Sequence, residues 1–116
     1  MNILFVCSAN EERSPTAEML FKDVPGWTTR SAGTNKDAVQ RISQELVNWS
    51  DKIIAMETHH YEEIIRMDPE AASKVNVLGI EDRYYRCSPE LLGRLIIGMS
   101  KRFELDSWVK KKFQCN

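Results

Sequence analysis

The sequence has few cysteines and no long apolar run, and both shortages narrow the class of protein. Its three cysteines, Cys7, Cys87 and Cys115, are odd in number and widely spaced, which fits neither a disulfide scaffold nor a metal site built on paired cysteines. We therefore expect reduced thiols. Nothing in the sequence approaches the roughly 20 consecutive apolar residues that a transmembrane helix needs, so no membrane span is expected.

The chain also lacks a strong excess of charge of either sign. Its formal net charge is -1 and 28% of its residues are charged, so the composition does not indicate binding to nucleic acid or to a membrane. The apolar opening, residues 1–6, has no basic leader and is too short for a signal-peptide core, which favours a cytoplasmic protein. With 116 residues and no linker, repeat or low-complexity segment, we expect one domain over residues 1–116, whose oligomeric state is left open.

Short apolar segments alternate with segments of helical periodicity along most of the chain. Strands are expected at residues 2–7, 27–32, 52–56 and 74–78. Apolar residues at helical spacing predict helices that span residues 14–24, 38–49, 59–67 and 92–103. The first strand is a continuous apolar run, as in strands that are buried on both faces of a parallel sheet. This alternation indicates an α/β fold with a parallel sheet and right-handed connections.

The segment from Cys7 to Arg13 joins the first strand to the first helix. A loop in this position directs successive backbone N–H groups inward, and the helix terminus adds positive potential, so the turn from Ser8 to Ser14 is suited to bind a tetrahedral dianion. Arg13 would bind two of its oxygens with a planar guanidinium, and the same field favours the thiolate of Cys7. Ser14 is expected to cap the helix.

Asp82 is a second candidate at the same edge of the sheet. It follows the fourth expected strand as Cys7 follows the first, and ligands of parallel α/β sheets bind beyond the carboxyl ends of the strands. The residue types alone leave alternatives open. Cys7 could be an inert buried thiol, Arg13 a surface residue at a helix start, and Asp82 one of 17 acidic residues in a polar loop.

Four short stretches carry a resemblance to a known family. "CSANEERSPTAE" at 7–18, "SAGT" at 31–34, "AM" at 55–56 and "EDRYY" at 81–85 resemble the low-molecular-weight protein tyrosine phosphatases, most closely a short bacterial branch of predicted tyrosine phosphatases. The likeness covers most of the chain to about residue 100. It implies a four-stranded parallel sheet in the order 2-1-3-4 flanked by helices, the phosphotyrosine phosphatase I-like fold. It also implies hydrolysis of phosphomonoesters through a cysteinyl-phosphate, and we expect no cofactor and no metal.

The resemblance also implies roles for individual residues. Cys7 resembles the nucleophile, Arg13 the group that binds the phosphate and stabilises the transition state, and Asp82 the general acid that protonates the leaving oxygen and then activates water. Asn10 would shape the loop, and the Ser14 hydroxyl would support the thiolate. The expected substrate is a phosphorylated protein or a small aryl phosphate. The other expected substrate-binding residues are Ser8, Ala9, Glu11, Glu12, Tyr84 and Tyr85.

This sequence departs from the family pattern in three places. Glu11 and Glu12 replace an apolar residue and a second cysteine, so two carboxylates are expected to flank an anion site, to weaken dianion binding and to disfavour the thiolate of Cys7. The replaced cysteine also removes a disulfide partner that would protect Cys7 from oxidation. Arg83 takes the place of a proline after the acid. The insertion that normally follows SAGT is short, which predicts a shallower pocket.

Two other functions remain open at this stage. The first is a non-catalytic or weakly active phosphate-binding regulatory module, in which Glu11 and Glu12 have abolished turnover. The second is a thiol-dependent arsenate reductase, which shares the fold and the loop. That activity needs relay cysteines between the third and fourth strands, whereas Cys87 and Cys115 lie later in the chain.

Two further groups of residues are not assigned to the site. His59 and His60 are neighbours on a helix and point about 100° apart, so they are poor metal co-ligands and are expected on the helix surface. The basic run 110–112 is expected to be a solvated chain end. Trp108 and Phe113 could dock this tail on the domain or bind a second copy of the chain.

Overall fold

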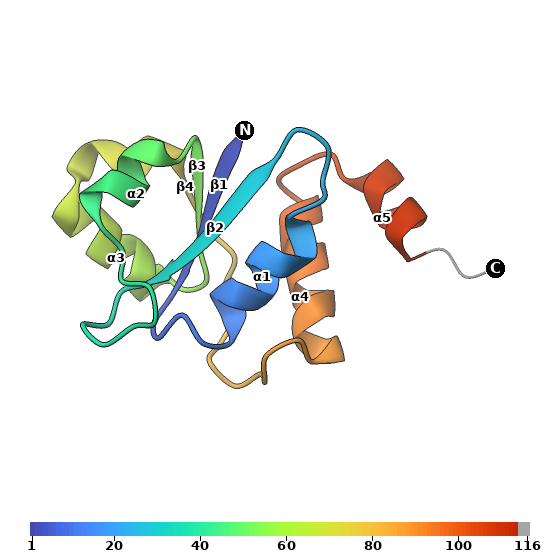
Figure 1. Ribbon diagram of the computed structural model, residues 1–116, viewed down its shortest axis with the longest axis horizontal. Coiled ribbons are helices and arrows are strands. Elements are labelled where there is room, and N and C mark those ends of the chain that lie inside the picture. The colour runs from blue at the N-terminus through green and yellow to red at the C-terminus, as the bar shows by residue number, and fades with distance from the viewer. Residues whose placement is uncertain (114–116) are drawn as a thin grey trace.

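The computed structural model, which describes residues 1–113, contains a parallel sheet between two layers of helices (Figure 1). Its strands are β1 (Asn2–Cys7), β2 (Thr28–Gly33), β3 (Lys52–Ala55) and β4 (Val75–Val77). All neighbouring strands are parallel, and their order is β2-β1-β3-β4, which confirms the expected sheet. The third expected thiol, Cys115, lies outside the described residues.

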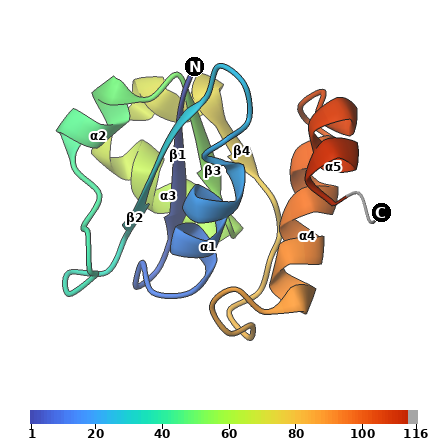
Figure 2. The ribbon, with the colours of Figure 1, turned by 45° about the vertical axis from the view of Figure 1, so that its right-hand side comes forward.

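Helices cover both faces of the sheet (Figure 2). They are α1 (Arg13–Phe21), α2 (Gln44–Trp49), α3 (Thr58–Met67), the short 3-10 helix η1 (Pro69–Lys74), α4 (Pro89–Ser100) and α5 (Asp106–Lys112). Helices α1 and α4 pack on the face that includes Ile3 and Phe5, and α2 and α3 pack on the face that includes Leu4 and Val6. The continuous apolar run of β1 therefore fills two cores at once.

The expected helix over residues 38–49 is wrong in its first half. Only Gln44–Trp49 is helical, and Ser43 caps it by accepting a hydrogen bond from the backbone of Leu46 at 3.2 Å. The preceding segment forms a bridge to β2 at Arg41 instead, because Gly33 donates a backbone hydrogen bond to Gln40 at 2.8 Å and accepts one from Ile42 at 2.9 Å. This pairing with the end of β2 replaces the helical hydrogen bonds.

The C-terminal segment docks on its own chain through α5. The ring of Trp108 lies 5.3 Å from the ring of Phe21, and its indole N–H donates to the carboxylate of Asp23 at 3.2 Å. Lys112 forms an ion pair with the same carboxylate at 3.0 Å, so this member of the basic run is not merely solvated, and the bond holds the pKa of Asp23 below its usual value. Across residues 1–113, each helix is too short or too polar to cross a bilayer.

Candidate active site

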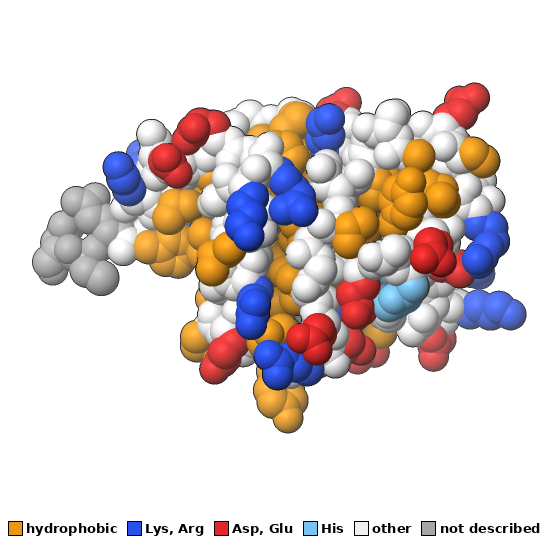
Figure 3. Space-filling model, turned by 180° about the vertical axis from the view of Figure 1, so that it is seen from behind, with side chains coloured by type: hydrophobic (Ala, Val, Ile, Leu, Met, Phe, Trp, Pro, Cys, Tyr) orange, Lys and Arg blue, Asp and Glu red, His pale blue; other side chains and the backbone are white. Residues whose placement is uncertain are grey.

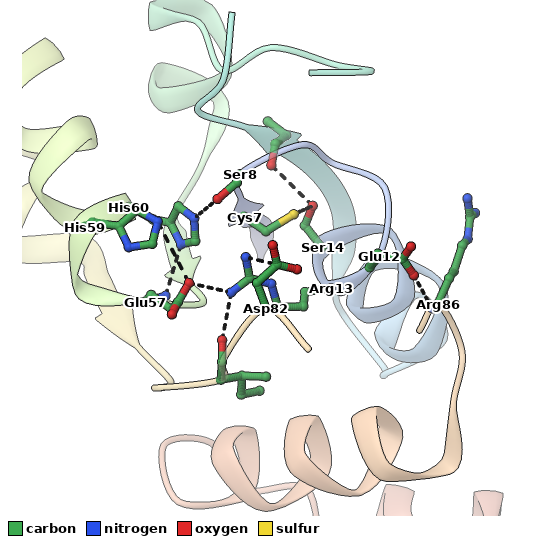
Figure 4. A network of polar contacts seen from close by, with 12 residues as sticks. Cys7, Ser8, Glu12, Arg13, Ser14, Glu57, His59, His60, Asp82 and Arg86 are labelled. Atoms are coloured by element: carbon green, nitrogen blue, oxygen red, sulfur yellow. Dashed lines mark hydrogen bonds and ion pairs between the residues drawn. The ribbon is translucent and has the colours of Figure 1, made fainter. Parts of the chain in front are cut away.

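The loop of residues 8–12 carries β1 into α1 at the carboxyl edge of the sheet, and Cys7 is the last residue of the strand (Figure 4). Cys7 is 2% exposed, and its Sγ lies 3.0 Å from the hydroxyl of Ser14. That hydroxyl accepts a hydrogen bond from Asn10 at 2.9 Å, so its single proton is free to go to the sulfur or to the carbonyl of Ala32 at 3.3 Å. The site thus places a hydroxyl donor against the thiol.

The expectation that Ser14 caps α1 is wrong. The helix begins at Arg13, and the residue before it, Glu12, makes no side-chain cap hydrogen bond. Ser14 is completely buried inside the first turn, where its hydroxyl faces Cys7 and Asn10 rather than the helix terminus. The backbone N–H groups at the start of α1 are therefore left without a side-chain cap.

The backbone N–H groups of the loop have no acceptor among the described residues. Within residues 1–113, the amides from Ser8 to Ser14 donate no hydrogen bond, although the loop carbonyls of Ser8 and Ala9 accept bonds from Asn35 and Val39 at 3.0 Å and 3.1 Å. Buried backbone donors are nearly always satisfied, by protein, water or ligand. A run of free amides beside a helix start is the arrangement that binds tetrahedral anions.

Asn10 fixes the shape of this loop. It adopts a positive φ of 58°, a conformation in which asparagine is more readily accommodated than most residues. Its buried side chain donates to the hydroxyls of Ser14 and Ser31, both at 2.9 Å, and accepts from the backbone of Gln40 at 3.1 Å. One side chain therefore ties the loop to α1, to β2 and to the extended segment after β2.

The guanidinium of Arg13 is held from two other strand ends. Arg13 is 1% exposed, and its Nη1 donates to the carboxylate of Glu57 and to the carbonyl of Ile80, both at 2.8 Å. Its Nη2 lies 3.8 Å from the carboxylate of Asp82. The β3–α3 and β4–α4 loops thus meet at Arg13. This position lies at the carboxyl ends of the strands, where the sequence predicted the site.

The loop after β4 holds Asp82 and the two tyrosines in different settings. The Asp82 side chain is 67% exposed and faces Arg13. Tyr84 packs partly buried against the core, and Arg83 covers its ring at 5.1 Å and donates to its hydroxyl at 3.2 Å. Tyr85 is 82% exposed. Tyr84 is thus held against the core cluster that includes Cys7, whereas Tyr85 is open to solvent.

The two glutamates of the loop differ in their contacts. The carboxylate of Glu12 accepts a hydrogen bond from the backbone N–H of Arg86, away from Cys7 (Figure 4). The expectation that both carboxylates flank the anion site is therefore wrong for Glu12, whose backbone amide remains part of the loop. Glu11 is exposed.

Sequence analysis missed the contribution of Glu57 and His60. His59 is 59% exposed as expected, and Figure 3 shows histidine surface beside acidic side chains, but His60 is completely buried. Its Nδ1 accepts from the backbone N–H of Glu57 at 3.1 Å, which leaves the proton on Nε2, 2.8 Å from the hydroxyl of Ser8. Burial, and then the charges of His59 and Arg13, lower the pKa of His60 to about 3.

The same residues form the cluster that comes nearest to a metal site within residues 1–113. The potential ligand atoms of Glu57, His59 and His60 lie within 4.8 Å of one another. However, the Glu57 carboxylate is bound to Arg13, and both ring nitrogens of His60 are bound to protein groups. A metal ion would have to break these contacts, so the cluster is organised around Arg13 and Ser8 instead.

Comparison with known proteins gives one curated relative above 30% identity and several solved structures of the same fold. No family model matches the sequence. The protein-arginine-phosphatase of Geobacillus stearothermophilus is 32% identical, over an alignment that covers 66% of this chain and 68% of the relative.

Two solved structures extend the comparison to nearly the whole chain. The tyrosine phosphatase Wzb from Escherichia coli K30, in complex with phosphate, is 25% identical with a TM-score of 0.72, covering 86% of this chain and 88% of its own. The YwlE arginine phosphatase from Geobacillus stearothermophilus is 23% identical with a TM-score of 0.70, covering 99% and 98%. These similarities confirm the expected fold class.

Proposed function

Because the chain belongs to the low-molecular-weight protein tyrosine phosphatase family, we propose that it hydrolyses phosphorylated protein side chains through a cysteinyl-phosphate at Cys7. The observation that carries this proposal is the loop itself. A thiol with a hydroxyl at 3.0 Å begins a run of free backbone amides that ends at a buried arginine. These are the parts needed to bind a dianion and to attack its phosphorus.

In the first step, the thiolate of Cys7 attacks phosphorus, an S–P bond forms, and the bond from phosphorus to the leaving atom breaks. Arg13 and the loop amides stabilise the charge on the three remaining phosphoryl oxygens. Asp82 gives its proton to the leaving atom, because an alkoxide or phenoxide leaves more easily with a proton. Its exposed carboxyl, 3.8 Å from Arg13, supports this role.

In the second step, water attacks phosphorus, and the carboxylate of Asp82 takes one of its protons. The S–P bond breaks, Cys7 leaves as a thiolate that the Ser14 hydroxyl can stabilise, and inorganic phosphate departs. The two steps together hydrolyse the phosphorylated side chain with no change of oxidation state. This distinguishes the proposed reaction from arsenate reduction, which would need relay thiols.

The first candidate substrate is phosphotyrosine, as the family resemblance implies. It is supported by the similarity to the tyrosine phosphatase Wzb. The loop after β4 offers Tyr85 as an exposed aromatic side chain that could contact a substrate ring.

Phosphoarginine is a second candidate, which a separate set of observations favours. The curated relative at 32% identity is a protein-arginine-phosphatase. In this chain the rim carries exposed carboxylates, Glu11 on the loop and Glu81 and Asp82 after β4, while Tyr84 is packed against the core. Negative charge at the rim attracts a cationic guanidinium more than a neutral phenol ring.

The proposed function is tested by turnover of p-nitrophenyl phosphate by the wild type, Cys7→Ser and Cys87→Ser. Cys87 is an exposed free thiol and is therefore the matched control. We expect Cys7→Ser to abolish release of p-nitrophenol and Cys87→Ser to retain it. Equal rates for the wild type and Cys7→Ser would contradict the proposal.

The choice between substrates needs a second assay with two peptides of the same sequence. One peptide carries phosphotyrosine and the other phosphoarginine, and release of inorganic phosphate is followed for each. A kcat/KM for phosphoarginine at least about tenfold higher, equal to about 1.4 kcal/mol, would assign the chain to the second candidate. The reverse ratio would assign it to the first.

A further inference from the structure

The N-terminus of α3 contacts both sides of the anion-binding loop. Glu57 and His60, which we call the α3 cap, form a reciprocal capping box: the Glu57 side chain accepts from the backbone of His60, and the His60 ring accepts from the backbone of Glu57. In most helices such a box satisfies only the helix terminus. Here each of its side chains also reaches a residue of the loop.

Glu57 reaches the far end of the loop. Its carboxylate accepts from Nη1 of Arg13 at 2.8 Å, and the arginine side chain is only 2% exposed. The carbonyl of Ile80 accepts from the same nitrogen, so two acceptors fix one edge of the guanidinium plane. The carboxylate also balances the charge of a buried cation whose other anionic neighbour, Asp82, is 67% exposed.

His60 reaches the near end of the loop. Its Nδ1 is occupied by the Glu57 backbone N–H, so the ring is a neutral imidazole whose Nε2–H donates to the Ser8 hydroxyl at 2.8 Å. Ser8 directly follows Cys7 in the chain. The ring therefore fixes the first residue of the turn while its partner in the cap fixes the last.

We propose that the α3 cap is a positioning unit for the phosphatase reaction, in which Glu57 orients the Arg13 guanidinium and His60 orients Ser8, so that both ends of the loop are set by one helix terminus. Neither side chain touches the reacting atoms. The inference rests on the proposed function, because it assigns the cap a role in phosphoryl transfer at the same site.

Glu57→Gln separates orientation from charge. Glutamine keeps the size of the side chain but replaces the charge-assisted bond to Arg13 by a weaker neutral one, and it removes the negative charge that competes with a bound dianion. We expect kcat to fall about tenfold to a hundredfold as the guanidinium loses its fixed plane, while the dissociation constant for inorganic phosphate does not rise. Damage to the loop would instead lower kcat and weaken phosphate binding together. Glu62→Gln, an exposed glutamate on α3, is the matched control.

For His60, two amide variants separate its two hydrogen bonds. The amide nitrogen of His60→Gln lies near the position of Nε2 and retains a donor for Ser8, whereas that of His60→Asn lies near Nδ1 and does not. We expect His60→Gln to keep kcat within about threefold of the wild type and His60→Asn to lose about tenfold or more. Equal losses would show that the ring acts only by filling space and would overturn its positioning role.

The deciding experiment combines these kinetics with a readout that does not depend on turnover. In ¹⁵N-resolved spectra, we expect the guanidinium protons of Arg13 to be in slow exchange in the wild type and Glu62→Gln, and to average in Glu57→Gln. If the wild type turns over substrate but Glu57→Gln matches Glu62→Gln in kcat and in spectra, the inference is overturned. If the wild type neither binds inorganic phosphate nor turns over, the proposed function fails instead.

Discussion

Gly33 lies directly against Ser8. A Cβ at position 33 would be 2.4 Å from the carbonyl oxygen of Ser8 and 2.9 Å from the backbone nitrogen of Asn10. The glycine of the SAGT stretch therefore packs directly against the backbone of the loop at residues 8–12. This contact explains why the loop after β1 and the SAGT stretch at 31–34, which are far apart in the sequence, depend on each other.

Gly33→Ala is expected to displace the backbone of the loop at residues 8–12. Both close atoms are backbone, so relief requires the loop to move, and we expect a loss of stability of about 1–3 kcal/mol and a fall in kcat/KM of at least tenfold. Gly93→Ala is the matched control, because nothing lies within 4 Å of its added Cβ inside α4. It should stabilise the helix by about 0.5–1 kcal/mol and leave activity unchanged. Urea unfolding and p-nitrophenyl phosphate turnover measure both effects.

Asn10→Ala is expected to destabilise the protein and the loop together. The variant loses the hydrogen bonds to Ser14, Ser31 and Gln40 and places alanine at a φ of 58°. Buried partners left unsatisfied cost about 1–3 kcal/mol, so the free energy of unfolding should fall by at least that amount. Binding of inorganic phosphate, followed by calorimetry, should weaken at the same time. Unchanged phosphate affinity would show that the loop keeps its shape without this side chain.

Glu11 and Glu12 should respond differently to neutralisation. Glu11→Gln removes exposed charge at the rim and should lower KM for an anionic aryl phosphate, more strongly at low salt. Glu12→Gln should leave KM nearly unchanged, because its carboxylate is bound to the backbone of Arg86. A fall in KM for Glu12→Gln as large as that for Glu11→Gln would place both carboxylates at the site.

The buried imidazole of His60 predicts a pH dependence of stability. Its pKa is lowered to about 3 in the fold, chiefly by burial, whereas the unfolded chain takes up the proton near 6.5, the ordinary pKa of histidine. The unfolded state therefore binds more protons between these values, and stability falls as pH is lowered through this window, by at most about 1.4 kcal/mol per pH unit. We expect urea unfolding of the wild type to lose more stability from pH 6.5 to 4 than His60→Gln does. Parallel curves would show that His60 protonates in the folded state.

Much of the fold follows from patterns that are local in sequence. The apolar run of β1 and the strand order implied by the family resemblance both agree with the structure. Boundaries were less accurate, because apolar residues past a helix end still reach the core. Val24 follows α1 and Phe103 follows α4, yet both pack against the same cluster.

The errors arise where long-range contacts replace local rules. Residues 38–43 have helical periodicity, but backbone pairing with Gly33 on both sides of Arg41 keeps them out of a helix. Ser14 has the chemistry of a helix cap, but a buried thiol and Asn10 provide its partners instead. The α3 cap was missed because the partners of Glu57 and His60 lie 44 and 52 residues away in the chain.

The central claim is that phosphate is bound over the sulfur of Cys7 and transferred to it. Asp82→Asn should slow the attack of water more than the first step when the leaving group is p-nitrophenol, so an intermediate should accumulate. Rapid quenching followed by peptide mass spectrometry is then expected to find the phosphoryl group on the peptide that contains Cys7 and not on the one that contains Cys87. Release of p-nitrophenol with no phosphoryl group on Cys7, or with the group on Cys87, would contradict the account.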